Sequence, residues 1–189
     1  MDAYFDEQVF KNQNYTEKEF PKGEYEQCTF VNIDFTNASL SKALFLDCEF
    51  VDCNLSNAKV RDASFQNVTF QNCKMLGILF HECNTFGFSV GFEGCQLNHS
   101  SFYQVKMKNT RFQDTKLIGV DFSEADLTNA VFSACDFSTA TFEQTLLEKS
   151  DFRTSENYEF SPENNFIKGA KFSLNSVSGL LKEYQITID

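Results

Sequence analysis

Residues 121–140 read DFSEADLTNA VFSACDFSTA, and a large apolar residue recurs there at every fifth position: Phe122, Leu127, Phe132 and Phe137. Small residues stand two positions before the last three of these: Ala125, Ala130 and Cys135. The same spacing runs from Phe20 to Phe80 and again from Phe92 to Phe152. A period of five is neither the 3.6 of an α-helix nor the 2 of a β-strand. The pattern therefore indicates a repeat architecture.

Each five-residue unit also contains a residue suited to a tight turn. Through the first half of the chain, the position two after the large residue is Asn, Asp or Gly in nearly every unit, with Lys42 as an exception. These residue types tolerate a positive φ, and Asx side chains bond to the nearby backbone. Two residues per unit are therefore expected to point inward, and the chain turns once per unit. The period alone does not fix how many sides close one coil.

Two units, Ala125-Asp126-Leu127-Thr128-Asn129 and Cys135-Asp136-Phe137-Ser138-Thr139, resemble the motif A(D/N)Lxx of the pentapeptide-repeat family. The resemblance covers roughly residues 25–152. It implies an all-β fold, a right-handed quadrilateral β-helix with about twenty residues per coil. Coils stacked at ~4.8 Å would form a rod of roughly 35 Å, in which each residue lies over the residue twenty positions later. The 23 Phe side chains of the sequence would largely fill the axis of this solenoid.

The chain is predicted to form one solenoid domain, residues 1–172, followed by a cap at residues 173–189. The repeat is irregular at 155–166 and at 81–91, where two extra residues predict a small loop. That loop is either a tolerated insertion or a contact loop that exposes Phe86 or Phe88.

Beyond Phe172 the apolar residues recur at helical spacing and then alternate, so a helix and a short strand are expected. The open end of a solenoid requires a cap. This cap has more apolar residues than one coil end needs, which predicts a dimer interface, with a simple cap as the alternative. The residues of the predicted interface are Leu174, Val177, Leu180, Leu181, Tyr184, Ile186 and Ile188.

The cysteines and histidines give no indication of a catalytic or metal site. Five of the seven cysteines take the small inward position and are expected to act as small buried side chains: Cys28, Cys48, Cys53, Cys73 and Cys135. There is no CxxC pair, and the only histidines are His81 and His99. No nucleotide-binding or nucleophile motif is present. We therefore expect a binding protein without cofactor or metal, not an enzyme.

The N-terminal residues are acidic and lack the apolar run of a signal peptide, and no apolar stretch is long enough for a membrane helix. These features predict a cytoplasmic protein that does not bind membranes.

The formal net charge is −11, and the acidic residues are unevenly distributed. Between residues 117 and 151 the only basic residue is Lys149, and the acidic residues are Asp121, Glu124, Asp126, Asp136, Glu143, Glu148 and Asp151. Over ~8 Å of solenoid axis, duplex DNA would carry about five charges. The seven residues are therefore predicted to form a partner-binding surface with a DNA-like charge density, although a merely solvated face would have the same composition.

Residues 49–55 (EFVDCNL), 73–77 (CKMLG) and 170–174 (AKFSL) resemble the quinolone-resistance (Qnr) and albicidin-resistance pentapeptide proteins. This resemblance implies a homodimer through the C-terminal segment. It also implies a protein that imitates DNA, binds a type II topoisomerase (DNA gyrase or topoisomerase IV) and protects it from inhibitors such as quinolones, without binding nucleic acid itself. The alternative is a structural or general protein-interaction scaffold. Many protective members have long projecting loops, and the only comparable interruption here is at 81–91.

Overall fold

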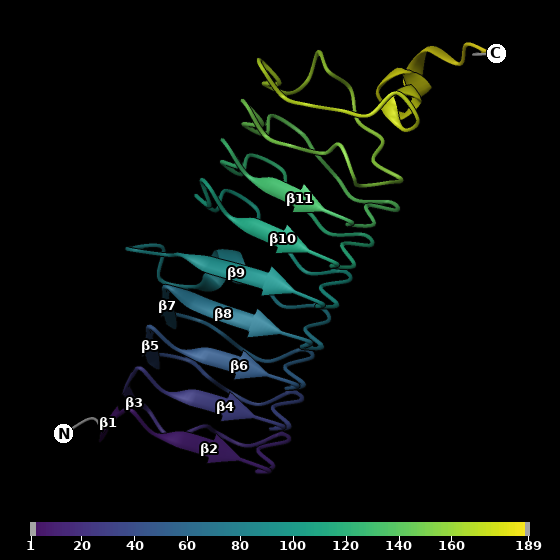
Figure 1. Cartoon of the computed structure of the whole chain (residues 1–189). Helices are drawn as coiled ribbons and strands as arrows, with labels where there is room; N and C mark the ends of the chain where they lie inside the picture. Colours follow the sequence, from purple (N-terminus) through teal and green to yellow (C-terminus); the bar gives the residue numbers. More distant parts are fainter. Residues whose placement is uncertain (1–2, 188–189) are drawn as a thin grey trace.

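The computed structural model describes residues 3–187 as a rod of stacked coils, with the N-terminus at one end and the C-terminus at the other (Figure 1). The strands are short because each one occupies only one side of a coil. In chain order they are β1 (Ala3–Asp6), β2 (Val9–Lys11), β3 (Gly23–Glu26), β4 (Thr29–Val31), β5 (Leu44–Leu46), β6 (Glu49–Val51), β7 (Ser64–Gln66), β8 (Val68–Gln71), β9 (Val90–Glu93), β10 (Arg111–Gln113) and β11 (Val131–Ser133).

Parallel ladders run the length of the rod and define its sides. One sheet has the order β1-β3-β5-β7 and the other has the order β11-β10-β9-β8-β6-β4-β2. Two further ladders consist of single bridges, such as Asn14 to Asp34 and Glu19 to Ser39. The four ladders are five residues apart in sequence and each repeats after twenty residues. This arrangement confirms the predicted all-β, four-sided solenoid.

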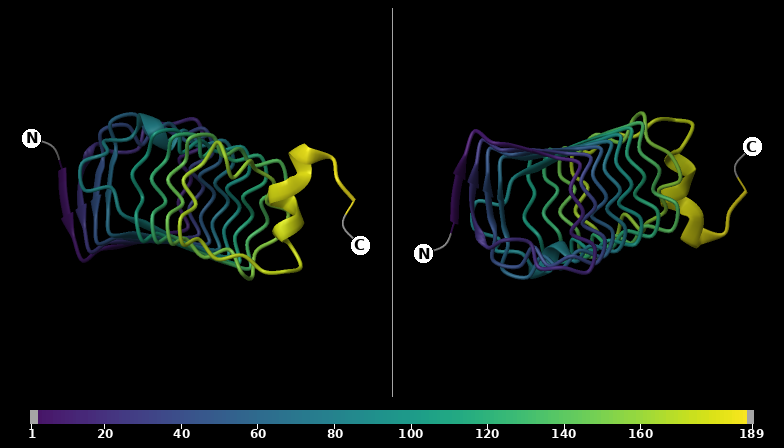
Figure 2. Two further views of the ribbon diagram at one scale, coloured as in Figure 1. Left: turned by 90° about the horizontal axis from the view of Figure 1, so that it is seen from above. Right: turned by 90° about the horizontal axis from the view of Figure 1, so that it is seen from below.

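We name each side after the large residue that it contributes to the first coil. The Phe5 face contains β1, β3, β5 and β7, and the Phe10 face contains β2, β4, β6 and β8 to β11. The Tyr15 face and the Phe20 face contain the single-bridge ladders. Viewed from either end, the coils follow one another with a small offset (Figure 2).

Aromatic rings stacked along the axis form the core. Rings on the same face stack nearly parallel, as between Phe80 and Phe102, whose centroids are 4.5 Å apart with an interplanar angle of 5°. Rings on adjoining faces meet edge to face, as between Phe20 and Phe35 at 81°. The small inward residues are buried at the corners beside them. Burial of each large side chain contributes about 1.5–3 kcal/mol, so the repeated Phe residues dominate the stability of the rod.

The corners of the coil are residues with a left-handed backbone. Asn32, Asn37 and Asp47 have φ values of 51°, 54° and 52°. Lys42, which breaks the Asx pattern, has the same conformation with φ of 66°. The fold therefore imposes this conformation at the corners even where the residue type does not favour it.

The two extra residues predicted within 81–91 lie between Asn84 and Val90. Ser64 is bridged to Asn84, an offset of twenty, whereas Val68 pairs with Val90, an offset of twenty-two. The short 3₁₀ helix η1 (Phe80–Glu82) precedes this loop. Because the offset returns to twenty afterwards, as between Phe92 and Phe112, the insertion is absorbed within one coil.

The C-terminal cap is formed by the 3₁₀ helix η2 (Val177–Tyr184). Leu180 is buried and Val177 packs against the core, so this helix covers the last coil. Gly179 permits the close approach, because a Cβ atom at this position would collide with the carbonyl oxygen of Tyr158.

The short strand predicted after this helix is not present in the described residues. Gln185 adopts a left-handed conformation with φ of 51°, which turns the chain away from η2. Ile186 and Thr187 then have no strand partner within residues 3–187. Ile188 lies outside the described residues.

Candidate partner-binding surfaces

The seven acidic residues predicted as one surface lie on all four sides of the rod. Asp121 belongs to the bridge ladder of the Phe20 face, Asp126 to the Phe5 face, Asp136 to the Tyr15 face and Asp151 to the Phe10 face. The physical reason is that a stretch of 35 residues passes almost twice around a coil of twenty. The structure brings together only Asp121, Glu124 and Glu143, on the Phe20 face.

Several of these carboxylates are engaged in turns and ion pairs. Oδ1 of Asp136 accepts hydrogen bonds from the backbone N and the Oγ of Ser138, at 3.0 and 2.7 Å. The buried Asp126 accepts the equivalent bonds from Thr128 and lies 3.2 Å from Lys108 Nζ. These interactions stabilise the corners of the coil, so much of the charge between residues 117 and 151 has a structural role.

Asp151 is the most strongly paired of the seven. Arg153 donates to both oxygens of its carboxylate, at 3.0 Å from Nε and 2.7 Å from Nη2. The hydrogen bonds from Arg153 hold the pKa of Asp151 below its usual value. Glu148 is half-buried on the Phe5 face.

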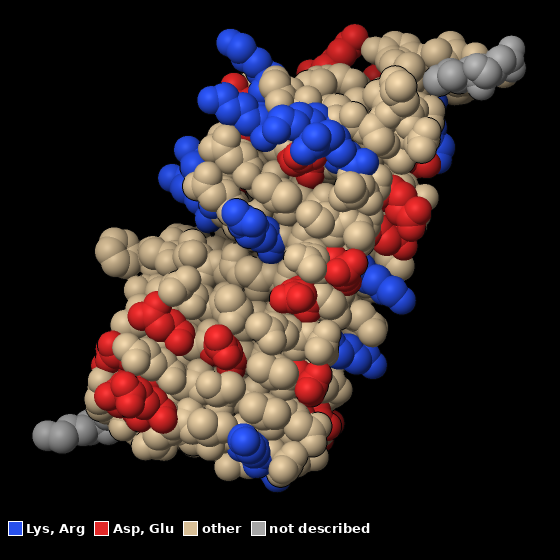
Figure 3. Space-filling model, viewed as in Figure 1, with Lys and Arg blue, Asp and Glu red and all other residues tan. Residues whose placement is uncertain are grey.

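An acidic surface that the sequence did not predict lies on the first three coils of the Phe5 face. We call it the N-terminal acidic surface; it consists of Asp6, Glu7, Glu24, Glu26 and Asp47. Tyr4 pairs with Glu24 in the ladder, and Asp6 pairs with Glu26. Strands β1, β3 and β5 contain no Lys or Arg. Red side chains gather at this end of the rod in Figure 3.

Hydrogen bonds hold this surface in place without neutralising it. The hydroxyl of Tyr4 donates to Glu26 Oε2 at 2.7 Å, and this bond raises the pKa of Tyr4 to about 12. Asn67 Nδ2 donates to Asp47 Oδ1 at 2.6 Å. The acidic residues lie about twenty positions apart in sequence, and this offset was the signal that could have identified the surface.

The C-terminal half of the rod has a basic surface across the Phe5 and Phe10 faces. Its exposed residues are Lys106, Lys108, Arg111, Lys149, Arg153, Lys168 and Lys171. Blue side chains cover this part of the rod in Figure 3. The half of the rod next to the cap is therefore of mixed charge, and the charge on the Phe5 face changes sign along the axis.

Phe86 projects from the loop where the charge changes sign. Its side chain is 80 % exposed, and its backbone N donates to Asn84 Oδ1 at 3.1 Å. The contact-loop interpretation named Phe88 as the alternative to Phe86, and Phe88 is not exposed: it is buried and meets Phe80 edge to face, with centroids 6.2 Å apart. Phe88 fills the core position that the insertion would otherwise leave empty.

The cap has its own apolar surface, and not all of the predicted interface residues contribute to it. Leu174 is 93 % exposed, and Tyr184 and Ile186 are also exposed. Leu181 and Val177 are half-buried, and Val177 packs against the core, whereas Leu180 is buried and is not available to a partner.

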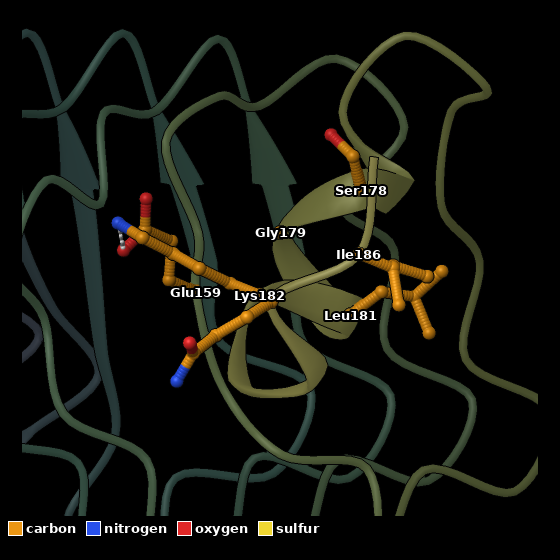
Figure 4. A pocket seen from close by; sticks show the side chains of 7 residues that line it. Glu159, Ser178, Gly179, Leu181, Lys182 and Ile186 are labelled. Carbon is orange, nitrogen blue, oxygen red and sulfur yellow. Dashed lines mark hydrogen bonds and ion pairs between the residues drawn. The ribbon is translucent and has the colours of Figure 1, made fainter. Parts of the chain in front are cut away.

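Beside this surface is an open hollow of about 480 Å³, lined by Leu181 and Ile186 and by the ion pair of Lys182 with Glu159 (Figure 4).

The seven cysteines are free and buried. Burial raises the pKa of Cys48 to about 12 and that of Cys135 to about 11, so both are neutral thiols at physiological pH. The described residues contain no group of three or more His, Cys, Asp and Glu side chains that could hold a metal ion. Within residues 3–187, no helix has the length and apolar character needed to cross a membrane.

The sequence matches the family model of the pentapeptide repeat region over residues 23–89 and 86–161. The chain therefore belongs to the pentapeptide-repeat family. No curated protein sequence matches it.

Among solved structures, it is similar to a trypsin-treated form of QnrB1, a plasmid-mediated fluoroquinolone resistance protein, with a TM-score of 0.81, 18% identity and 100% of both chains covered. A second trypsin-treated QnrB1 matches with a TM-score of 0.62 and 20% identity over 98% of this chain and 97% of that chain. The full-length QnrB1 matches with a TM-score of 0.53 and 20% identity over 97% of this chain and 100% of that chain.

Proposed function

We propose that this protein is a DNA-mimicking binding protein whose partner is a type II topoisomerase, DNA gyrase or topoisomerase IV. The observation that carries the proposal is the N-terminal acidic surface, an array of carboxylates on one side of the rod whose strands β1, β3 and β5 contain no Lys or Arg. Charge complementarity of this kind steers a partner with a positively charged DNA-binding groove and suppresses other partners.

The charge density of this surface is close to that of one DNA strand. Its five carboxylates occupy three coils, about 14 Å of axis. One strand of DNA carries a phosphate every ~3.4 Å, which gives about four charges over the same length. The proposed contact thus moves from residues 117–151 to the opposite end of the rod, with Asp121, Glu124 and Glu143 as a smaller secondary contact.

The similarity to QnrB1 supports the proposal at the level of fold. QnrB1 is a fluoroquinolone resistance protein, and the fold that it shares with this chain is compatible with a shared role. We propose that this chain also protects its topoisomerase partner from quinolones, with Phe86 as a contact outside the acidic surface.

The cap is the proposed dimer interface. Leu174, Tyr184 and Ile186 are exposed apolar side chains on the end of the rod, where a second copy would cover them. A cap-to-cap dimer would place the two N-terminal acidic surfaces at its outer ends. Each end would then contact the enzyme separately, in contrast to one continuous acidic surface at the centre of the dimer.

The test is the affinity of a purified type II topoisomerase for three forms of the protein. The variant Glu24→Gln/Glu26→Gln/Asp47→Asn removes three charges and preserves the side-chain shapes and hydrogen bonds. The control Glu93→Gln/Asp114→Asn/Glu156→Gln removes the same charge from exposed residues elsewhere. We expect the first variant to bind at least about tenfold more weakly than the control, and wild-type binding to weaken with salt. Equal affinities of the two variants, or binding unaffected by salt, would contradict the proposal.

A second candidate function is favoured by the basic surface of the C-terminal half, which a DNA mimic does not require. A general interaction scaffold would use both signs of charge to hold a different protein. If affinity purification of the wild-type protein returns one consistent partner and no topoisomerase, this second function is favoured.

A further inference from the structure

The Phe5 face has exposed aromatic side chains at its two ends and at its middle. A level is one coil's position in the ladder of this face. Tyr4 at the first level is 55 % exposed, Phe86 is 80 % exposed and Phe166 at the last level is 56 % exposed. Aromatic residues are enriched where proteins bind each other, because each contributes a large area at low entropic cost. These three side chains lie along one side of the rod.

The levels of this face can be counted from its bridges. One segment of the ladder passes through Tyr4, Glu24, Leu44, Ser64 and Asn84. After the loop, a second segment passes through Lys106, Asp126, Leu146 and Phe166. Phe86 follows directly after the fifth of these nine levels, so Tyr4 and Phe166 lie four levels to either side of it.

The charges on the face change sign at the same middle level. The N-terminal acidic surface occupies the first three levels. The exposed lysines Lys106, Lys108, Lys149 and Lys168 lie beyond the loop, together with the buried Asp126 and the half-buried Glu148. One half of the face is therefore negative and the other half is of net positive charge.

Such a face is complementary to a second copy of itself turned end to end. We propose that two chains associate through their Phe5 faces in an antiparallel arrangement, with the two-fold axis running parallel to the strands beside Phe86. An axis in this direction keeps each residue's position across the face and reverses its level. A residue of one copy thus meets the residue at the same strand position on the opposite level of the other, as in any isologous interface.

This operation pairs aromatic side chains with one another at the ends and the centre of the interface, and it pairs an acidic with a basic side chain at each end. Tyr4 of one copy meets Phe166 of the other at each end of the interface, and Phe86 meets its own counterpart at the centre. Asp6 and Lys168 occupy the same strand position on opposite levels and become neighbours. Glu26 faces Glu148, but Lys149 lies next to Glu148 and offsets that repulsion.

The face is about 38 Å long and narrow, so it buries less than a standard interface and the association is weak and salt-sensitive. Nucleic acid is the other occupant that a row of lysines could attract. The second copy is favoured because the negative half of the same face, and the net charge of −11, repel a polyanion.

Disulfide trapping tests the arrangement directly, since the native thiols are buried. We would prepare the full chain with Tyr4→Cys and, separately, with Phe166→Cys, and oxidise each alone and as an equimolar mixture. Antiparallel association predicts a cross-linked dimer chiefly in the mixture, and Phe86→Cys cross-linking to itself. As a matched control, Glu93→Cys places a thiol on the Phe10 face and should not cross-link to itself.

Several results would overturn the proposal. Phe166→Cys cross-linking to itself as efficiently as the mixture would indicate a parallel arrangement, and equal yields at position 93 would indicate random collision. Duplex DNA is the other occupant to test. If no cross-link forms, and an oligonucleotide binds wild type but not the variant Lys106→Gln/Lys108→Gln/Lys168→Gln, the face would be assigned to nucleic acid. None of these measurements includes a topoisomerase, so their outcome can be distinguished from that of the proposed function. Because both proposals use the N-terminal acidic surface, the two associations would exclude each other.

Discussion

The side chains that point into the rod and those that point out of it follow the same period of five, but they are subject to different constraints. Inside, each large side chain packs against the equivalent side chains one coil above and one below, so the column is apolar along its length, as in Phe20, Leu40, Val60 and Phe80. Outside, the equivalent exposed positions of the Phe5 face are occupied by Glu24, Lys106 and Phe166. The interior therefore determines the fold, whereas the exterior is free to determine what the rod binds.

The largest expected effect comes from placing the same charge on either side of this boundary. Phe112→Asp would bury an unpaired carboxylate within the ring stack, whereas Gln113→Asp places it on the neighbouring exposed residue of β10. We expect Phe112→Asp to prevent folding, because such burial costs several kcal/mol or more, and Gln113→Asp to melt close to wild type. Circular dichroism melting curves provide the measurement. A cooperative transition of the Phe112→Asp protein at the wild-type temperature would show that the column is not the core.

A smaller effect is expected where the solenoid meets its cap. Gly179→Ala introduces a Cβ that collides with the backbone at Tyr158, so η2 must move away from the last coil. Ser178→Ala, on the exposed side of the same helix, is the control. We expect Gly179→Ala to lower stability by about 1–3 kcal/mol in urea unfolding. Equal stability of the two variants would show that the cap does not pack as described.

Alkaline pH is expected to weaken the core through its cysteines. Burial raises the pKa of Cys48 to about 12 and that of Cys135 to about 11, above the unfolded value of about 9. Because the pKa of these thiols is higher in the folded than in the unfolded protein, their contribution to stability is complete below pH 9 and is lost as the pH rises towards 12. The melting temperature should fall over this interval, and less steeply in Cys48→Ala/Cys135→Ala. The same slope in wild type and variant would show that these thiols are not the cause.

The smallest effect is expected from the carboxylates at the corners. Hydrogen bonds from Thr36 lower the pKa of Asp34, and those from Arg153 lower the pKa of Asp151. Because the pKa of these two carboxyl groups is lower in the folded than in the unfolded protein, their contribution to stability is present above about pH 4 and is lost as the pH falls below it. Asp34→Asn/Asp151→Asn should flatten the acid limb of the stability profile and cost about 1 kcal/mol at neutral pH. An unchanged acid limb would contradict this role.

The period of five was sufficient to predict the fold, because every inward position is fixed by contacts that repeat along the axis. The inward positions of Cys28, Cys48, Cys53, Cys73 and Cys135 followed from the same pattern. The candidate surface did not follow from sequence proximity, because neighbours on a face are twenty residues apart in the chain. Asp6 and Glu26 lie side by side, whereas Asp126 and Asp136 lie on different faces.

The loop at 81–91 shows a second limit of the period. Composition did not determine which of Phe86 and Phe88 would be buried, since both flank Gly87. The register across the insertion determines which of the two is buried. The coil needs one large inward side chain before β9, and Phe88 occupies that position. The choice depends on the neighbouring coil, which local sequence does not contain.

Competition with DNA is the most direct test of DNA mimicry by the N-terminal acidic surface. The apparent affinity of a type II topoisomerase for this protein would be measured at increasing concentrations of duplex DNA, with the Glu24→Gln/Glu26→Gln/Asp47→Asn variant in parallel. DNA mimicry predicts that the apparent Kd rises in proportion to the DNA concentration, and that the variant is displaced by less DNA than wild type. Binding of wild type that persists unchanged at saturating DNA would contradict it.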